Sequence, residues 1–279
     1  MNGRNLFKLL DPSRPAMSPG CFDALSALLV QQAGFPCVSI SGAAYTAETL
    51  GKPDLGFSNL DDMVLLVERI TSVVDIPVLV DCDSGYGNAI TATNAMQRLQ
   101  KAGAACVCFQ DENKFTGEIE TASRMCGLLE AVAAVKDDDT LLMARTDSYG
   151  KYGIDDALER ASRYRDSGAD VLFIDGVKPE DFSKLKEVFI DVPLKYNNAI
   201  KKDGFQYSAQ ELGAFGFSLI AYSSSLQKVA IKSMQGVLAE LLATGKTAGW
   251  LDKAVTQSER NSIVGHGKWK EMSEKYIRG

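Results

Sequence analysis

The chain has 279 residues, of which 46% are hydrophobic and 24% are charged. This balance is typical of a globular protein and argues against a disordered chain, a collagen-like repeat or a coiled coil. Lys and Arg number 30 against 36 Asp and Glu, which gives a formal net charge of -6. Nonspecific nucleic-acid binding relies on a net basic surface, so no nucleic-acid partner is expected.

The sequence also gives no sign of a membrane or of secretion. No stretch reaches the roughly 20 uncharged apolar residues that a bilayer span needs, and residues 1–8 lack the apolar core of a secretion signal. We therefore expect a cytoplasmic protein without membrane contact. Most of the six cysteines stand in apolar runs without a CxxC pair, which favours buried thiols over a zinc site. The one histidine, His266, excludes an HExxH metal site.

Eight apolar runs of strand length alternate with segments of helical spacing. Several runs, such as residues 171–174, are continuously apolar, as expected of parallel strands that are covered on both faces. Segments such as 22–33 and 90–102 place apolar residues at three- and four-residue steps, and glycine often follows. The predicted strands are 16–21, 37–41, 77–81, 106–110, 140–145, 171–175, 192–196 and 218–222.

Eight strand–helix repeats predict one α/β domain, a (β/α)8 TIM barrel within residues 1–279. The alternative is an open doubly wound sheet, which the strand count and the lack of a Gly-rich phosphate motif disfavour. Residues from about 227 to 279 exceed the length of one barrel helix. They are expected to form a C-terminal helical extension that contacts another subunit.

Polar residues follow nearly every predicted strand, where the active sites of such barrels lie. Asp81 and Asp83 stand two residues apart at the end of the third strand and should point the same way. A divalent cation such as Mg²⁺ would neutralise them, since it binds through one or two carboxylates and retained waters. The alternative is a turn with solvated aspartates. Gly85 and Gly87 would let the backbone approach a ligand.

Arg145 ends the apolar run 141–144, where an unpaired charge is costly. Its planar guanidinium suits a substrate carboxylate or phosphate. The alternative is an internal ion pair with Asp147 or Asp175. Asp54, in a loop with turn residues, is by itself a turn aspartate.

Four stretches together resemble the isocitrate lyase / phosphoenolpyruvate mutase superfamily. They are PGCFDALSA at 19–27, LGKPDLG at 50–56, VDCDSGYGN at 80–88 and ARTD at 144–147. The similarity runs in consistent order over about residues 5–230. Among the branches of the superfamily, it is strongest to 2-methylisocitrate lyase, dimethylmalate lyase and carboxyphosphonoenolpyruvate mutase.

The resemblance implies a barrel whose last helix is exchanged between subunits of a homodimer or homotetramer. It also implies Mg²⁺, with Mn²⁺ as a substitute, at Asp81, supported by Asp83 and with Gln110 near the metal waters. A small carboxylate substrate would be bound by Ser41, Gly42, Ala43, Asn197 and Arg145. The candidate catalytic residues are Asp54, Arg145, Tyr45 and Asp175.

The loop after the fourth strand departs from the family pattern. Lyases of the family carry Lys-[Lys/Arg]-Cys-Gly-His there, whereas residues 110–121, QDENKFTGEIET, contain neither Cys nor His. The Asn-Ser pair of the mutases is absent too, and the loop looks several residues short. Gln110 and Asp175 each stand where the family has Glu, and Lys195 and Tyr196 are unlike the lyase pattern.

Proton transfer must therefore come from another residue than the usual loop cysteine. Cys126 is the one thiol nearby, but it falls in a predicted helix and is expected to be buried. A surface position or a subunit contact is a more natural role for His266 than catalysis. The candidates for proton transfer are Tyr45, Glu112, Glu118, Glu120, Lys195 and Tyr222.

The combined expectation is a Mg²⁺-dependent lyase acting on a small 2-oxo or 2-hydroxy dicarboxylic acid. It would cleave a C–C bond by a retro-aldol reaction or a decarboxylation, through an enolate stabilised by the metal. One alternative is a P–C bond mutase or hydrolase acting on substrates like phosphonopyruvate. The other is a non-catalytic family member, favoured by Gln110 and the short loop.

Overall fold

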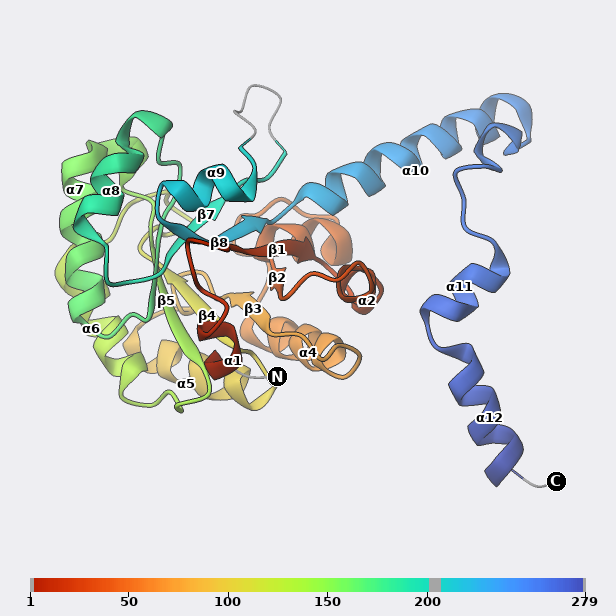
Figure 1. Ribbon diagram of the computed structural model, residues 1–279, viewed down its shortest axis with the longest axis horizontal. Helices are drawn as coiled ribbons and strands as arrows, with labels where there is room; N and C mark the ends of the chain where they lie inside the picture. The colour runs from red at the N-terminus through yellow and green to blue at the C-terminus, as the bar shows by residue number, and fades with distance from the viewer. Residues whose placement is uncertain (1–2, 201–206, 278–279) are drawn as a thin grey trace. The chain divides into compact units, whose positions relative to one another are not determined.

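Eight parallel strands close into one barrel in chain order in the computed structural model, which describes residues 3–200 and 207–277 (Figure 1). Closure is made by β8 against β1, with Ala16 opposite Leu219. The expected (β/α)8 barrel is confirmed, and the open doubly wound sheet is wrong. The strands are β1 (Ala16–Cys21), β2 (Val38–Ile40), β3 (Val78–Asp81), β4 (Cys106–Gln110), β5 (Leu141–Thr146), β6 (Val171–Ile174), β7 (Leu194–Asn197) and β8 (Phe217–Tyr222).

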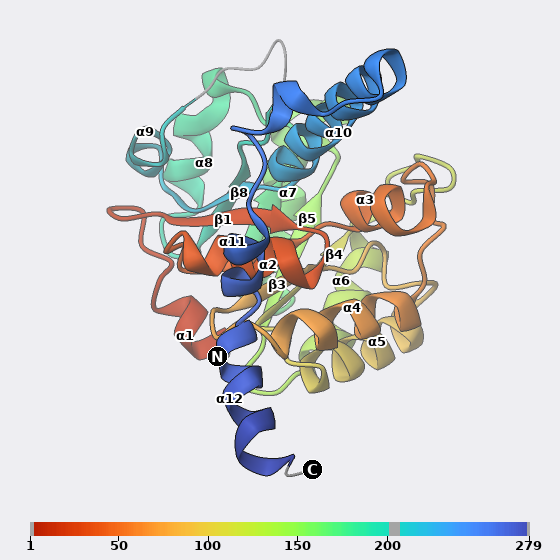
Figure 2. The same cartoon turned by 90° about the vertical axis from the view of Figure 1, so that its right-hand side faces the viewer.

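Helices follow the strands and surround the barrel (Figure 2). Several begin at a side chain that accepts backbone N–H groups of the first turn; Asn88, for example, accepts from Ile90 and Thr91. The helices of the barrel unit are α1 (Gly3–Phe7), α2 (Ala24–Gln32), α3 (Gly42–Tyr45), the π-helix η1 (Thr46–Leu50), α4 (Leu60–Thr71), α5 (Ala89–Lys101), α6 (Ala122–Ala133), α7 (Tyr149–Asp166), the 3₁₀ helix η2 (Pro179–Asp181), α8 (Phe182–Val188) and α9 (Ala209–Ala214).

Most strands are apolar on both faces because one face fills the barrel and the other packs against the helices. In β4, Cys106 and Cys108 belong to the cluster inside the barrel, whereas Val107 and Phe109 belong to the cluster under the helices. Gln110 continues the inward-facing series at the end of the strand. This layering explains the continuous apolar runs in the sequence. All six cysteines are free and buried, as expected.

The chain divides into two compact units, Met1–Leu226 and Gln227–Gly279. The second unit consists of most of α10 (Ser225–Thr244), then η3 (Ala248–Trp250), α11 (Gln257–Ile263) and α12 (His266–Tyr276). It exposes large apolar side chains, among them Leu238, Leu242 and Trp269. His266 is exposed at the start of α12. Within the described ranges, no helix has the length and apolar character needed to cross a membrane.

Gly20 on β1 lies against the backbone that follows β8. A Cβ atom added there would lie 1.8 Å from the carbonyl oxygen of Ser223, just after β8. We predict that Gly20→Ala lowers the free energy of unfolding by about 1–3 kcal/mol, because backbone must move to admit a methyl group. Gly127→Ala is the control, since the added Cβ meets nothing within 4 Å on α6. Urea unfolding that shows equal stability for Gly20→Ala and wild type would contradict this packing.

Candidate active site

A cavity of about 240 Å³ opens at the carboxyl ends of the strands. Its floor is made of the inward-facing residues Leu79, Cys106, Cys108, Met143 and Phe173. Polar side chains surround the floor, so a small polar molecule could be held above an apolar base. The predicted site residues that line this cavity are Ser41, Ala43, Asp54, Asp81, Arg145 and Asn197.

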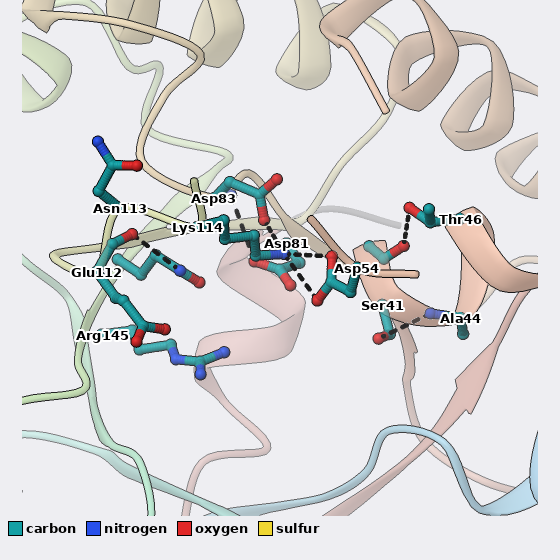
Figure 3. Close-up of polar contacts among 12 residues, drawn as sticks. Ser41, Ala44, Thr46, Asp54, Asp81, Asp83, Glu112, Asn113, Lys114 and Arg145 are labelled. Carbon is teal, nitrogen blue, oxygen red and sulfur yellow. Dashed lines mark hydrogen bonds and ion pairs between the residues drawn. The ribbon is translucent and has the colours of Figure 1, made fainter. Parts of the chain in front are cut away.

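Lys114 joins the acidic residues on one side of the cavity. Its Nζ atom donates to both carboxylate oxygens of Asp54, at 2.9 and 3.1 Å, and forms an ion pair with Oδ1 of Asp83 (Figure 3). A Cβ built on Gly42 would lie 3.6 Å from Lys114 Nζ and 3.7 Å from both Asp81 Oδ2 and Asp83 Oδ1. Three charged groups therefore converge on one position beside Gly42.

The loop after β3 reaches this arrangement through an unusual backbone. Asp83 and Tyr86 have φ values of 47° and 58°, in the left-handed region, which costs an L-residue about 1–2 kcal/mol. Gly85, with φ 81°, cannot be replaced easily, because a Cβ there would lie 2.6 Å from that of Ala92 on α5. Gly85 thus allows the loop to pack closely against α5.

The loop after β4 is short and held by internal hydrogen bonds. Glu112 and Ile119 form an antiparallel bridge, and Asn113 Oδ1 accepts the N–H groups of Phe115 and Thr116 at 2.9 and 3.3 Å. This turn presents Lys114 toward the cavity. The neighbouring Phe115 ring contacts Gly56, where an added Cβ would lie 2.6 Å from the ring. Two adjacent residues thereby hold the loop against segment 54–56.

Burial and neighbouring charges set the protonation of this group. Burial and the Asp81 carboxylate raise the pKa of Asp83 to about 6, although Lys114 opposes the shift. Burial also disfavours ionised Asp81, but the charges of Lys114, Arg145 and Lys195 outweigh it and lower the pKa of Asp81. Burial acts against the Lys114 ammonium, yet Asp81 and Asp83 raise its pKa above the ordinary value. Asp54, Asp81 and Asp83 together outnumber the one ammonium in contact with them.

These residues fit a hard divalent cation that keeps several waters. Asp54, Asp81 and Asp83 supply the carboxylate oxygens that Mg²⁺ prefers. Gln110 donates from Nε2 to the carbonyl of Glu112 at 3.1 Å, while its buried Oε1 accepts no hydrogen bond from the described residues. Such an acceptor suits a metal-bound water. Among residues 3–200 and 207–277, no group of three His, Cys, Asp or Glu side chains is arranged to bind a metal directly.

Arg145 is internally paired. Its Nε donates to both carboxylate oxygens of Asp147, at 3.0 and 2.9 Å, and an Nη atom donates to Asp175 at 3.2 Å. Asp147 and Asp175, the two internal partners that the sequence analysis considered for Arg145, are therefore both bonded to it. The guanidinium still lines the cavity, but two carboxylates fix its orientation and balance its charge.

A buried carboxylate that the sequence did not single out supports this pair. Asp111, fully buried, accepts the N–H of Asp147 at 2.9 Å and the hydroxyls of Thr146 and Tyr164 at 2.7 and 2.8 Å. It thereby ties the end of β4 to the end of β5 and to α7. Its position directly after Gln110 at a strand end was the available signal.

The predicted substrate-binding residues take up ordinary structural hydrogen bonds at the cavity. Ser41 caps α3 by accepting the N–H of Ala44 at 3.4 Å, and the carbonyl of Gly42 accepts the hydroxyl of Thr46 at 2.8 Å (Figure 3). Asn197 accepts the hydroxyl of Ser223 at 3.2 Å. These bonds leave the Ser41 hydroxyl proton and the Asn197 amide group available to a ligand.

Tyr45 is not brought to the cavity. It is 7% exposed in the core beneath the helices, where burial and the Asp62 carboxylate of α4 raise its pKa. Of the other candidates for proton transfer, Glu120 pairs with Arg124 at 3.5 Å and Tyr222 packs against the core. Lys195 alone among them lines the cavity. Cys126 is buried on α6, as expected.

The comparisons with known proteins agree with the fold and the motifs. A family model described as phosphoenolpyruvate phosphomutase matches residues 6–242. The chain is 31% identical to 2,3-dimethylmalate lyase of Eubacterium barkeri, over 98% of this chain and 97% of that protein. It is 32% identical to the chloroplastic carboxyvinyl-carboxyphosphonate phosphorylmutase of Arabidopsis thaliana, over 96% and 83%.

A solved structure of oxaloacetate acetylhydrolase superposes with a TM-score of 0.90 at 26% identity, covering 98% of each chain. The relatives include enzymes named for C–C cleavage and for mutase chemistry, so the expected superfamily is confirmed at the level of both sequence and fold. The chain belongs to the phosphoenolpyruvate mutase family, within the isocitrate lyase / phosphoenolpyruvate mutase superfamily.

Proposed function

We propose that this protein is a Mg²⁺-dependent lyase that cleaves a C–C bond in a small 2-oxo or 2-hydroxy dicarboxylic acid. The observation that carries the proposal is the cavity at the carboxyl end of the barrel. It has an acidic cluster on one side and the cationic groups of Arg145 and Lys195 among its walls. Relatives with named activities on substituted malates and on oxaloacetate support the choice of substrate class.

The reaction needs a place for charge that develops on the substrate. When the C2–C3 bond of a 2-hydroxy dicarboxylate breaks, the hydroxyl loses its proton and becomes a carbonyl. The electron pair of the broken bond stays on C3, which then takes up a proton. A bound Mg²⁺ would supply Lewis-acid stabilisation of the substrate oxygens during this charge shift.

The residues of the chain divide the remaining tasks. Asp81 and Asp83 would hold the metal through its first shell or its waters, and Gln110 would accept a hydrogen bond from such a water. Ser41 and Asn197 offer polar contacts to the substrate, and Arg145 faces it with an orientation fixed by its carboxylate partners. The apolar floor keeps water from the reacting carbons.

A P–C bond mutase or hydrolase is the second candidate. The 32% identity to a phosphorylmutase over almost the whole chain favours it. The same cavity would then take a phosphonate in place of one carboxylate. Because the two reactions release different products from different substrates, one assay panel separates them.

We further propose that the second unit completes a homodimer or homotetramer by helix exchange. Its helices leave Leu238 63% exposed and Leu242 91% exposed, and single helices with such faces are covered in stable proteins. With this unit covering a partner, the chain would act as one barrel domain with an extension. The six unpaired cysteines are typical of a reducing compartment and support a cytoplasmic location.

The proposed activity predicts metal-dependent pyruvate release. Oxaloacetate, 2-alkylmalates, 2-methylisocitrate and phosphonopyruvate would be assayed with Mg²⁺ and with EDTA. We expect release from at least one dicarboxylate, and we expect EDTA or Asp81→Ala to reduce it at least about 100-fold, because Lewis-acid stabilisation is lost. Asp61→Ala, an exposed carboxylate on α4, is the control and should retain activity.

Release from phosphonopyruvate alone would select the P–C candidate instead. If no substrate releases pyruvate and the protein binds no Mg²⁺, the enzymatic proposal is contradicted and a non-catalytic family member is favoured.

The position of Lys114 predicts competition between its ammonium and the metal. Lys114→Met should tighten Mn²⁺ binding at least about tenfold, because a positive charge in contact with Asp54 and Asp83 is removed. Free Mn²⁺ would be measured by electron paramagnetic resonance. Lys184→Met is the matched control, since this lysine is half exposed and pairs with Asp181 on the outer surface. Equal Mn²⁺ affinity of Lys114→Met and wild type would contradict this competition, because it would show that the Lys114 ammonium and the metal occupy separate places.

The subunit proposal predicts a change of mass in solution. Leu238→Glu combined with Leu242→Glu should convert the oligomer to a monomer, because charges on an apolar contact face are not solvated there. Light scattering after size-exclusion chromatography measures the mass. A wild-type monomer, or an oligomer that survives both substitutions, would contradict the assignment of this face.

A further inference from the structure

Lys195 is the cavity residue that neither the family pattern nor the proposed metal chemistry accounts for. It lies on β7 opposite Phe173 of β6 and Leu219 of β8. The pairing between β7 and β8 shifts register between Leu194 and Lys195. Adjacent residues of a strand point to opposite faces, so Leu194 packs under the helices while Lys195 lines the cavity.

The surroundings of the ammonium are largely apolar. Lys195 Nζ lies 4.2 Å from the centroid of the Phe173 ring, and the neighbouring walls are Met143, Cys106 and Cys108. A cation over an aromatic ring gains only about 0.5–2 kcal/mol, and the half-buried Lys195 side chain has no carboxylate in contact that would balance its charge. Within residues 3–200 and 207–277, its Nζ has neither a hydrogen bond nor an ion pair. The site is therefore electrostatically incomplete.

The other cations near the cavity are already neutralised. Arg145 bonds to Asp147 and Asp175. Lys114 bonds to Asp54 and Asp83. Among the described lining residues, Lys195 is thus the cation whose charge no contacting carboxylate balances.

The place of Lys195 in the barrel indicates what would balance it. Strands β3 and β7 stand four apart in an eight-strand barrel, so Lys195 faces the Asp81 side across the cavity. A molecule with one end at the acidic cluster and its metal would reach Lys195 with the other end. That other end meets an ammonium on an apolar wall, which selects an anion.

We propose that Lys195 is a specificity-determining residue that binds the second, distal carboxylate of a dicarboxylate substrate. The inference deepens the proposed function and rests on it for the orientation of the substrate. Lys195 then selects diacids over monoacids of the same size, while the metal side binds the end that reacts.

The test compares two ligands that differ in one end. Malate carries a distal carboxylate where 2-hydroxybutanoate carries a methyl group. Binding of each in the presence of Mg²⁺ would be measured by titration calorimetry with wild type, Lys195→Met and Lys195→Arg. Lys184→Met serves as the control on the outer surface.

Wild type should prefer malate, and Lys195→Met should weaken malate binding about 10- to 100-fold while leaving 2-hydroxybutanoate unchanged, as expected for one charge-assisted contact. Lys195→Arg should keep the preference for malate. Without ligand, Lys195→Met should melt at the same temperature as wild type or higher, because an unpaired charge is replaced by an apolar chain of similar length. A misfolded variant would instead melt lower.

Three results would overturn the inference. They are failure of wild type to prefer malate, an unchanged preference in Lys195→Met, and equal weakening of both ligands. The two proposals can fail separately. If Lys195→Met loses the preference for malate but no substrate releases pyruvate, the lyase proposal fails and the assignment of Lys195 as an anion site stands. If Lys195→Met releases pyruvate with the same KM as wild type, the lyase proposal stands and the assignment of Lys195 fails.

Discussion

Lys114 donates to Asp54 and pairs with Asp83 on the side of the cavity where β3 ends at Asp81. Carboxylates this close repel one another, and the repulsion is strong where burial removes water. A positive charge must lie between them for the loops after β2, β3 and β4 to meet. In the chain alone that charge is the Lys114 ammonium. In the proposed enzyme, Mg²⁺ would neutralise the carboxylates together with Lys114 or in its place.

Two structural features hold the rest of the site to this cluster. The left-handed residues Asp83 and Tyr86 turn the β3 loop toward the cavity at a cost that the surrounding packing must offset. Asp111 links the ends of β4 and β5 and fixes the carboxylate that orients Arg145. The acidic side of the cavity is thus built at the end of β3 and the basic side at the end of β5, with β4 between them, while Lys195 faces them from β7.

The barrel could be predicted from the sequence because its signals are local and repeated. Continuous apolar runs such as 171–174 and polar strand ends such as Asp81 follow directly from strands buried on both faces. The boundaries of the helices are harder to predict, as α7 shows, because Gly153, with φ 83°, interrupts it near its beginning.

The site was harder to predict because its contacts join distant segments. Lys114 stands 60 residues from Asp54 in the chain, and nothing in the text of the loop indicates that they touch. Tyr45 has the chemistry of a proton donor, but the helical turn of α3 directs it into the core. The pairing of Arg145 was anticipated as an alternative because an arginine at the end of an apolar run requires a partner.

A crystal structure of the protein soaked with Mn²⁺, with anomalous scattering recorded, tests the central claim most directly. The account predicts a metal peak beside the carboxylates of Asp81 and Asp83, with the Lys114 ammonium moved away from Asp83. A peak elsewhere, or a cluster without metal in which Lys114 still bridges Asp54 and Asp83, would contradict it.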